Sequence, residues 1–212
     1  MRVYSYFRSS AAYRVRIALN LKGLAYEYIA IHLTKGEQRA AGYLAVNPLA
    51  LVPAMIDDGA TLTQSLAIIE YLNERHRDPP LLPAGPGDRA RVRAIALAIA
   101  CDIHPLNNLR VLHYLTRVLN VSEDAKNTWY RHWIEIGLTA LETQLANDPA
   151  TGAFCHGDAP TLADICLVPQ LANARRFAIA LEPYPTLLRV DGNCARHAAF
   201  AAAAPERQPD AA

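Results

Sequence analysis

The chain has 212 residues, of which 52% are hydrophobic and 19% are charged. This composition disfavours intrinsic disorder and predicts one or two compact units with a sizeable core. Because 21 Lys and Arg residues are balanced by 20 Asp and Glu residues, bulk charge gives no reason to expect a nucleic-acid or membrane partner. The apolar runs are too short to span a bilayer, and the first residues lack the apolar stretch of a signal peptide, so we expect a cytoplasmic protein.

The first eighty residues alternate between strand and helix patterns. Their order predicts an α+β domain with the succession β-α-β-α-β-β-α. The predicted strands are residues 2–6, 26–31, 52–56 and 61–62, and the predicted helices are residues 10–21, 38–44 and 65–75.

Prolines and glycines are dense between residues 79 and 87, which is typical of a linker. We therefore expect three parts: a first domain at 1–80, a linker at 81–87 and an all-helical domain at 88–212. A long helix is predicted at 91–119, with a kink at Pro105.

The rest of the second half is also helical in pattern. A helix is predicted at 125–145, and the Thr161 to Asp164 start signal predicts a further buried helix, which is a feature of folding rather than a site. The Ala-rich stretch after Arg196 predicts a terminal helix, and the end of the chain from Pro205 a loose tail.

The four cysteines lack the C-x-x-C spacing of a redox or zinc motif. We expect buried free thiols rather than disulfides, and no metal site. The four are Cys101, Cys155, Cys166 and Cys194.

Ser9 and Ser10 lie where the first predicted strand passes into the first predicted helix. A hydroxyl there lies beside unpaired N–H groups and the positive end of the helix, so it suits an anion, although the same residues also serve as an ordinary N-cap. A thioredoxin-like redox protein would carry a cysteine at this turn, where Ala11 and Ala12 stand instead. If the domain takes part in thiol chemistry, the sulfur must come from a bound small molecule whose thiolate the hydroxyl stabilises.

Two further positions in the first half are candidates for holding a ligand. Val52 precedes Pro53 at the entrance of the third predicted strand, where a cis bond would help to leave its backbone groups open to another partner. Gln64 and Ser65 begin the helix after the fourth strand, and the N–H groups at that start could hold a carboxylate.

In the second half, polar residues surround Pro105. His104 and Asn108 are four residues apart and share a face of a regular helix, whereas Asp102 and His104 differ by roughly 200° around it. We therefore expect Asp102 and His104 to serve different pockets. Taken alone, His104 is better explained as a core histidine.

Several ordered segments together resemble the zeta class of glutathione transferases, which includes maleylacetoacetate and maleylpyruvate isomerases. The likeness covers nearly the whole chain. It is carried by YSYFRSS-x-x-YRVRIAL, NPLALVPAMI, TQSLAIIEYL, IHPLNNL, PTLADICLVPQ and RFAIALEPYPTL. The resemblance implies the glutathione transferase fold, in which a thioredoxin-like α+β domain precedes an all-α domain, and it implies a cytoplasmic homodimer that uses glutathione.

The resemblance also implies roles for individual residues. Ser9 matches the serine that activates the thiolate, Ser10 matches the second serine of the same motif, and both are expected to be catalytic and to bind glutathione. Ala11 stands where the family has a cysteine, so that cysteine is dispensable or this protein acts more narrowly. Asp102 is expected to reach the amine of the glutathione bound by the other subunit. The remaining implied glutathione contacts are Gln38, the backbone of Val52, Gln64, Ser65, His104 and Asn108.

Three arginines are candidates for binding the substrate. Maleyl diketo acids are dianions, and a planar guanidinium binds a carboxylate with two parallel hydrogen bonds. We expect Arg8, Arg110 and Arg176 to form the substrate site, although each alone would be an ordinary surface charge. Arg14 and Arg16 lie inside the first helix and are expected to be structural, close to neighbouring acids.

These observations predict a glutathione-dependent cis-trans isomerase that converts maleylpyruvate to fumarylpyruvate in aromatic-compound catabolism. Maleylacetoacetate is the alternative substrate; Arg110 favours the shorter diacid. A broad glutathione-conjugating transferase and a non-catalytic docking module of the same fold are the remaining alternatives. Ser9, Gln64 and Ser65 argue against the docking module.

Overall fold

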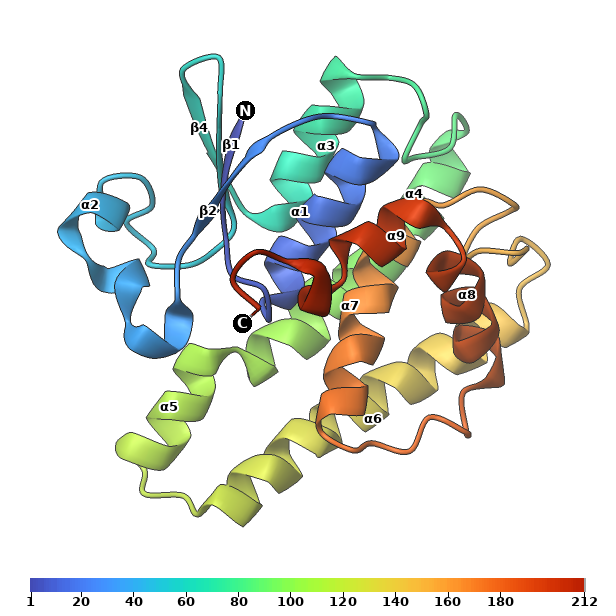
Figure 1. Ribbon diagram of the computed structural model, residues 1–212. Helices are drawn as coiled ribbons and strands as arrows, with labels where there is room; N and C mark the ends of the chain where they lie inside the picture. Colours follow the sequence, from blue (N-terminus) through green and yellow to red (C-terminus); the bar gives the residue numbers. More distant parts are fainter. Residues whose placement is uncertain (212) are drawn as a thin grey trace. The chain divides into compact units, whose positions relative to one another are not determined.

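A computed structural model describes residues 1–211 (Figure 1). The described chain forms two compact units. The first unit joins Met1–Leu81 to the segment from Ala195 onward, and the second unit is Leu82–Cys194. The final helical segment therefore groups with the N-terminal half rather than with the expected 88–212 domain, because α9 (Ala198–Ala203) packs on α1 (Ser10–Leu21).

The first unit contains a four-stranded sheet in the order β2-β1-β3-β4. The strand β1 pairs parallel with β2 and antiparallel with β3, which pairs antiparallel with β4. This confirms the predicted succession of elements. The strands are β1 (Arg2–Ser5), β2 (Glu27–Ala30), β3 (Ala54–Asp57) and β4 (Ala60–Thr63).

The helix predicted at 38–44 is broken in two. Ala40 is extended (φ −66°, ψ 142°), and it separates the short turn η2 (Glu37–Arg39) from α2 (Ala41–Leu44). Another short turn, η1 (Leu33–Lys35), precedes them, with Gly36 in the left-handed region at φ 81°. The left-handed residue and the extended one interrupt the helical hydrogen-bond ladder.

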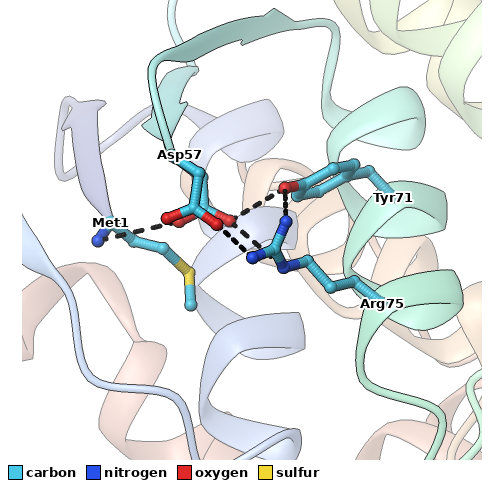
Figure 2. A network of polar contacts seen from close by, with 5 residues as sticks. Met1, Asp57, Tyr71 and Arg75 are labelled. Carbon is cyan, nitrogen blue, oxygen red and sulfur yellow. Dashed lines mark hydrogen bonds and ion pairs between the residues drawn. The ribbon is translucent and has the colours of Figure 1, made fainter.

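Helix α3 (Ser65–Arg75) packs beside α1. Figure 2 shows how its last turns are tied to the end of β3. The Tyr71 hydroxyl donates to Asp57 at 2.9 Å, and Asp57 also lies 3.9 Å from Arg75 Nε and 4.0 Å from the terminal amine of Met1. Asp57 pairs with Ala60 in the sheet, at the edge away from the Ser9 turn, so this network stabilises the far end of the unit.

The second unit is helical. Its elements are α4 (Pro86–Leu97), the π-helical segment η3 (Ala98–Ile103), the short turn η4 (His104–Asn107), α5 (Leu109–Arg117), α6 (Glu123–Ala146), α7 (Leu162–Arg176) and α8 (Pro185–Ala195). The expected start of α7 is confirmed: the Thr161 hydroxyl accepts from Ala163 N, while buried Asp164 accepts from Thr161 N at 2.7 Å. No helix within residues 1–211 is long and apolar enough to cross a membrane.

The long helix predicted at 91–119 does not form as one rod. Pro105 has no N–H for the helical ladder, and the chain widens into η3 before it and tightens into η4 around it. Asn108 is extended (φ −65°, ψ 143°) and is the N-cap of α5, its side chain accepting from Arg110 N at 3.1 Å. The prediction that His104 and Asn108 share one helix face is therefore wrong, and so is the regular-helix angle between Asp102 and His104.

The segment after α9 is not the loose tail that the sequence suggested. It contains the short turn η5 (Pro205–Arg207). The buried Gln208 amide then donates to the carbonyl oxygens of Ala202 and Ala204 at 3.0 and 2.9 Å. The side chain thus replaces the missing helical ladder, and it folds the segment back on α9.

Candidate functional site

One edge of the sheet in the first unit gathers the candidate residues. The register pairs Tyr4 with Ala54 and Ala54 with Thr63, so the end of β1, the start of β3 and the end of β4 lie in one row. The chain segments that join this edge carry Ser9, Val52 and Gln64, which the sequence singled out independently.

Ser9 is the N-cap of α1. Its Oγ accepts a hydrogen bond from Ala12 N at 3.2 Å, and its backbone N–H donates to Tyr6 O at 2.9 Å. Because a hydroxyl has one proton and two lone pairs, accepting from Ala12 leaves the proton of Ser9 available to donate to an anion. Ser10 follows as the first residue of the helix and is buried.

Arg16 holds the loop that leads to Ser9. Its side chain is fully buried, and it donates to Ser5 Oγ at 3.1 Å, Phe7 O at 3.1 Å and Ala203 O at 3.0 Å. Burial lowers the pKa of the Arg16 guanidinium. The prediction of a structural role agrees with these contacts, but the hydrogen-bond acceptors are carbonyl and hydroxyl oxygens rather than the expected acids.

The bond between Val52 and Pro53 is cis, as the sequence suggested. The paired residues of β3 begin at Ala54, so the backbone of Val52 lies beyond the paired part of the sheet. The preceding Leu51 carbonyl is held by Tyr43 Oη at 2.5 Å and Asn47 Nδ2 at 2.7 Å. These two side chains fix the approach to the cis bond, and no sequence pattern singles out either of them.

Gln64 has an unusual backbone conformation at the start of α3. Its φ is 68° and its ψ is 118°, which side-chain-bearing residues rarely adopt and which often marks a functional position. The next residue, Ser65, is buried, and its Oγ accepts from Arg14 Nη1 at 3.4 Å. The start of α3 is thus linked to α1 beside the Ser9 turn.

Gln38, in η2, is also buried, and its Oε1 accepts no hydrogen bond from the described residues. A buried amide oxygen without a donor is costly, and such an atom is commonly satisfied by water or a ligand. Arg8 is exposed, with its guanidinium 4.9 Å from the centre of the Phe7 ring.

In the second unit, Arg176 is exposed at the end of α7 and has no carboxylate partner in the described chain. Its Nη2 lies 3.3 Å from Asn173 Oδ1 and 3.5 Å from the Tyr130 hydroxyl. Its guanidinium lies 5.3 Å from the centre of the Phe177 ring, which stacks on Tyr130 at 3.5 Å between centroids. The neighbouring Arg175 instead pairs with Asp191 at 2.5 Å. Arg176 therefore keeps its charge available for an anion.

The other candidates of the second unit lie near Pro105. Asp102 is exposed on η3, His104 is half-buried in η4, and Arg110 is exposed in the first turn of α5. Asn108 uses its side-chain oxygen as a helix cap.

The buried cysteines are poor nucleophiles. Cys155 and Cys194 are free thiols with no exposed surface, and burial raises the pKa of both. Cys166 is also buried, whereas Cys101 is exposed, contrary to expectation. A reactive thiolate is therefore not supplied by the buried thiols, and the described residues hold no cluster of three or more His, Cys, Asp or Glu that could bind a metal ion.

Two family models match the chain. Residues 1–74 match the N-terminal domain of glutathione S-transferases, and residues 134–197 match their C-terminal domain. The chain therefore belongs to the glutathione S-transferase family.

Individual relatives indicate the class within this family to which the chain is similar. A probable maleylacetoacetate isomerase of Vibrio cholerae is 51% identical over 99% of this chain and 97% of its own. A bacterial zeta-class maleylpyruvate isomerase, solved in a holo structure, is 49% identical with a TM-score of 0.98 over all of both chains. A maleylacetoacetate isomerase of Methylobacterium extorquens, solved with bound malonate and glutathione, is 44% identical with a TM-score of 0.98 over all of both chains. The resemblance to the zeta class is confirmed.

Proposed function

We propose that the protein is a glutathione-dependent cis-trans isomerase that converts maleylpyruvate to fumarylpyruvate. The observation that carries the proposal is the shared sheet edge, where Ser9, Val52 and Gln64 converge in a chain whose relatives are maleyl isomerases. Maleylacetoacetate is the second candidate substrate, since relatives named for either acid are about equally similar, at 51% and 49% identity.

The residues of the first unit fit glutathione. The tripeptide offers a thiol, a backbone and two carboxylates, and the edge offers a hydroxyl at Ser9, an unpaired backbone segment at Val52 and a helix start at Ser65. The unsatisfied Oε1 of Gln38 accepts a donor such as an amide or ammonium group. We assign Ser9, Ser10, Gln38, Val52, Gln64 and Ser65 to glutathione.

Glutathione supplies the thiolate that adds to the cis double bond and leaves again after rotation about the resulting single bond. Ser9 donates its hydroxyl proton toward the sulfur, which favours the thiolate at neutral pH, and the positive start of α1 acts in the same direction. Arg176 binds a substrate carboxylate and stabilises charge that develops on the adjacent carbonyl. Arg8 and Arg110 are assigned to the same substrate.

An assay with three substrates distinguishes an isomerase from a conjugating transferase and from a docking module. Purified protein is given maleylpyruvate, maleylacetoacetate and dinitrochlorobenzene in turn, with and without glutathione. We expect loss of the maleyl chromophore that depends on glutathione, formation of the trans acid and no net consumption of glutathione. Accumulation of conjugate from dinitrochlorobenzene alone would favour a conjugating transferase, and no turnover together with no glutathione binding would favour a docking module.

Gln64 provides a test that separates backbone strain from ligand contact. Gln64→Gly removes the penalty of a positive φ, so the free energy of unfolding should rise by about 1 kcal/mol while affinity for glutathione falls. Gln64→Ala keeps the strained backbone, so it should lose affinity without gaining stability. Chemical denaturation and calorimetry measure the two effects, and unchanged glutathione affinity in both variants would remove Gln64 from the site.

The remaining assignments concern a second subunit. We propose a cytoplasmic homodimer in which Asp102 reaches the amine of the neighbouring subunit's glutathione. We also assign His104 and Asn108 to glutathione, in a different pocket from Asp102. Leu97 on α4 and Ile136 on α6 are 44% and 51% exposed, and we propose that the partner subunit covers them. Sedimentation equilibrium measures the assembly directly.

A further inference from the structure

We propose that Asp210 is a positioning residue that holds the Ser9 loop in its active conformation. This inference rests on the proposed function, because it assigns Asp210 to the activation of bound glutathione. The carboxylate joins two parts of the first unit: its Oδ2 accepts from Phe7 N at 3.1 Å, and its Oδ1 accepts from the Tyr28 hydroxyl at 2.6 Å.

The Phe7 peptide is anchored on both sides. Its N–H donates to Asp210, and its carbonyl oxygen accepts from Arg16 Nη2 at 3.1 Å. Both backbone groups of Phe7 are therefore fixed by side chains from outside the loop, only two residues before Ser9. A peptide held at both groups has little freedom to rotate, so the direction of the following turn is set as well.

Asp210 is itself held firmly. Tyr28 lies on β2, the strand that pairs with β1, and burial together with its hydrogen bond to Asp210 raises the pKa of its hydroxyl. Gln208, two residues before Asp210, donates hydrogen bonds from its side-chain amide to the carbonyl oxygens of Ala202 and Ala204, which fixes the backbone of this segment. Arg16, which reaches Ala203 O and Phe7 O, ties the same helical segment to the same loop.

The position of the Phe7 peptide affects the direction of the Ser9 hydroxyl. Ser9 must direct its hydroxyl proton at the sulfur, and a misplacement of a catalytic group by about 1 Å can cost on the order of a hundred-fold in rate. Removing Asp210 leaves Phe7 N–H without its acceptor and loosens the loop, while Ser9 itself is intact. Asp210 therefore acts through Ser9 and touches neither glutathione nor substrate.

The test compares Asp210→Ala with Asp210→Asn, which retains a carbonyl oxygen for Phe7 N–H and an amide that can donate to the Tyr28 oxygen. Glu206→Ala, at an exposed acid in the same segment, is the matched control. Amide hydrogen exchange on the ligand-free protein should show Phe7 and Ser9 exchanging at least about ten-fold faster in Asp210→Ala alone. This readout needs no glutathione, so it remains valid if the proposed function fails.

A second readout uses the glutathione complex. The pKa of the bound thiol, followed by thiolate absorbance, should rise by about one unit in Asp210→Ala, with kcat falling about ten-fold and KM nearly unchanged. In Asp210→Asn, the thiol pKa and kcat should both lie close to those of the parent protein. In Glu206→Ala, both should equal those of the parent protein. A lowered melting temperature with unchanged Phe7 exchange and unchanged thiol pKa would overturn the proposal and reduce Asp210 to a stability residue. Failure of the parent protein to bind glutathione would instead overturn the proposed function.

Discussion

Ser9→Ala is expected to lower kcat/KM for the maleyl substrate by about a hundred-fold, because the variant removes the hydroxyl that we assign to stabilising the thiolate. The pKa of bound glutathione should rise toward the value of about 8.5 typical of a free thiol, so part of the lost rate should return at higher pH. Steady-state kinetics across pH measures both effects.

A matched control exists in the same chain. Ser122 caps α6 as Ser9 caps α1: each serine oxygen accepts from the backbone N–H three residues later at 3.2 Å. Replacing either serine by alanine should cost about 1 kcal/mol of stability through loss of the cap. Only Ser9→Ala should change the kinetics, and equal kinetics for both variants would show that Ser9 is no more than a cap.

Arg176→Ala is expected to raise KM for the maleyl acid by about ten- to a hundred-fold, because the variant loses a charge-assisted hydrogen bond to a substrate carboxylate. The guanidinium contacts Asn173, Tyr130 and Phe177, which reduces the freedom that it loses when the substrate binds. Affinity for glutathione should be unchanged, which calorimetry checks.

Arg175→Ala is the control for this variant. Arg175 is adjacent in sequence and equally charged, but it pairs with Asp191. Its removal should affect stability and leave KM near that of the parent protein. If Arg175→Ala raises KM as much as Arg176→Ala, the effect belongs to the net charge of the region rather than to a substrate contact.

The fold could largely be predicted because its signals are local. The strand and helix succession of the first unit follows from hydrophobic periodicity, and the Thr161 capping box marks the start of α7. The sequence predicts only a kink where the helix breaks around Pro105. A π-helical segment and an extended Asn108 depend on contacts with α6, such as Asn107 Nδ2 to Tyr130 O at 3.2 Å, which periodicity does not reveal.

Some residues of the candidate site can also be predicted from local sequence patterns, whereas others depend on contacts between distant parts of the chain. Ser9 and Ser65 can be predicted because helix starts have a recognisable composition, and Val52 because a proline follows it. The roles of Asp210 and Arg16 in the site cannot be predicted in this way, because they depend on pairings between residues far apart in the sequence. Phe7 and Asp210 are 203 residues apart, and a half-buried Asp near a proline-containing end has no distinguishing pattern.

A structure of the protein with glutathione tests most directly whether the nucleophilic sulfur is supplied by the tripeptide and activated by this chain. We predict that the sulfur lies within hydrogen-bonding distance of Ser9 Oγ, with the cysteinyl backbone beside Val52 and the γ-glutamyl carboxylate at Gln64 and Ser65. Glutathione bound with its sulfur turned away from Ser9 would contradict the account.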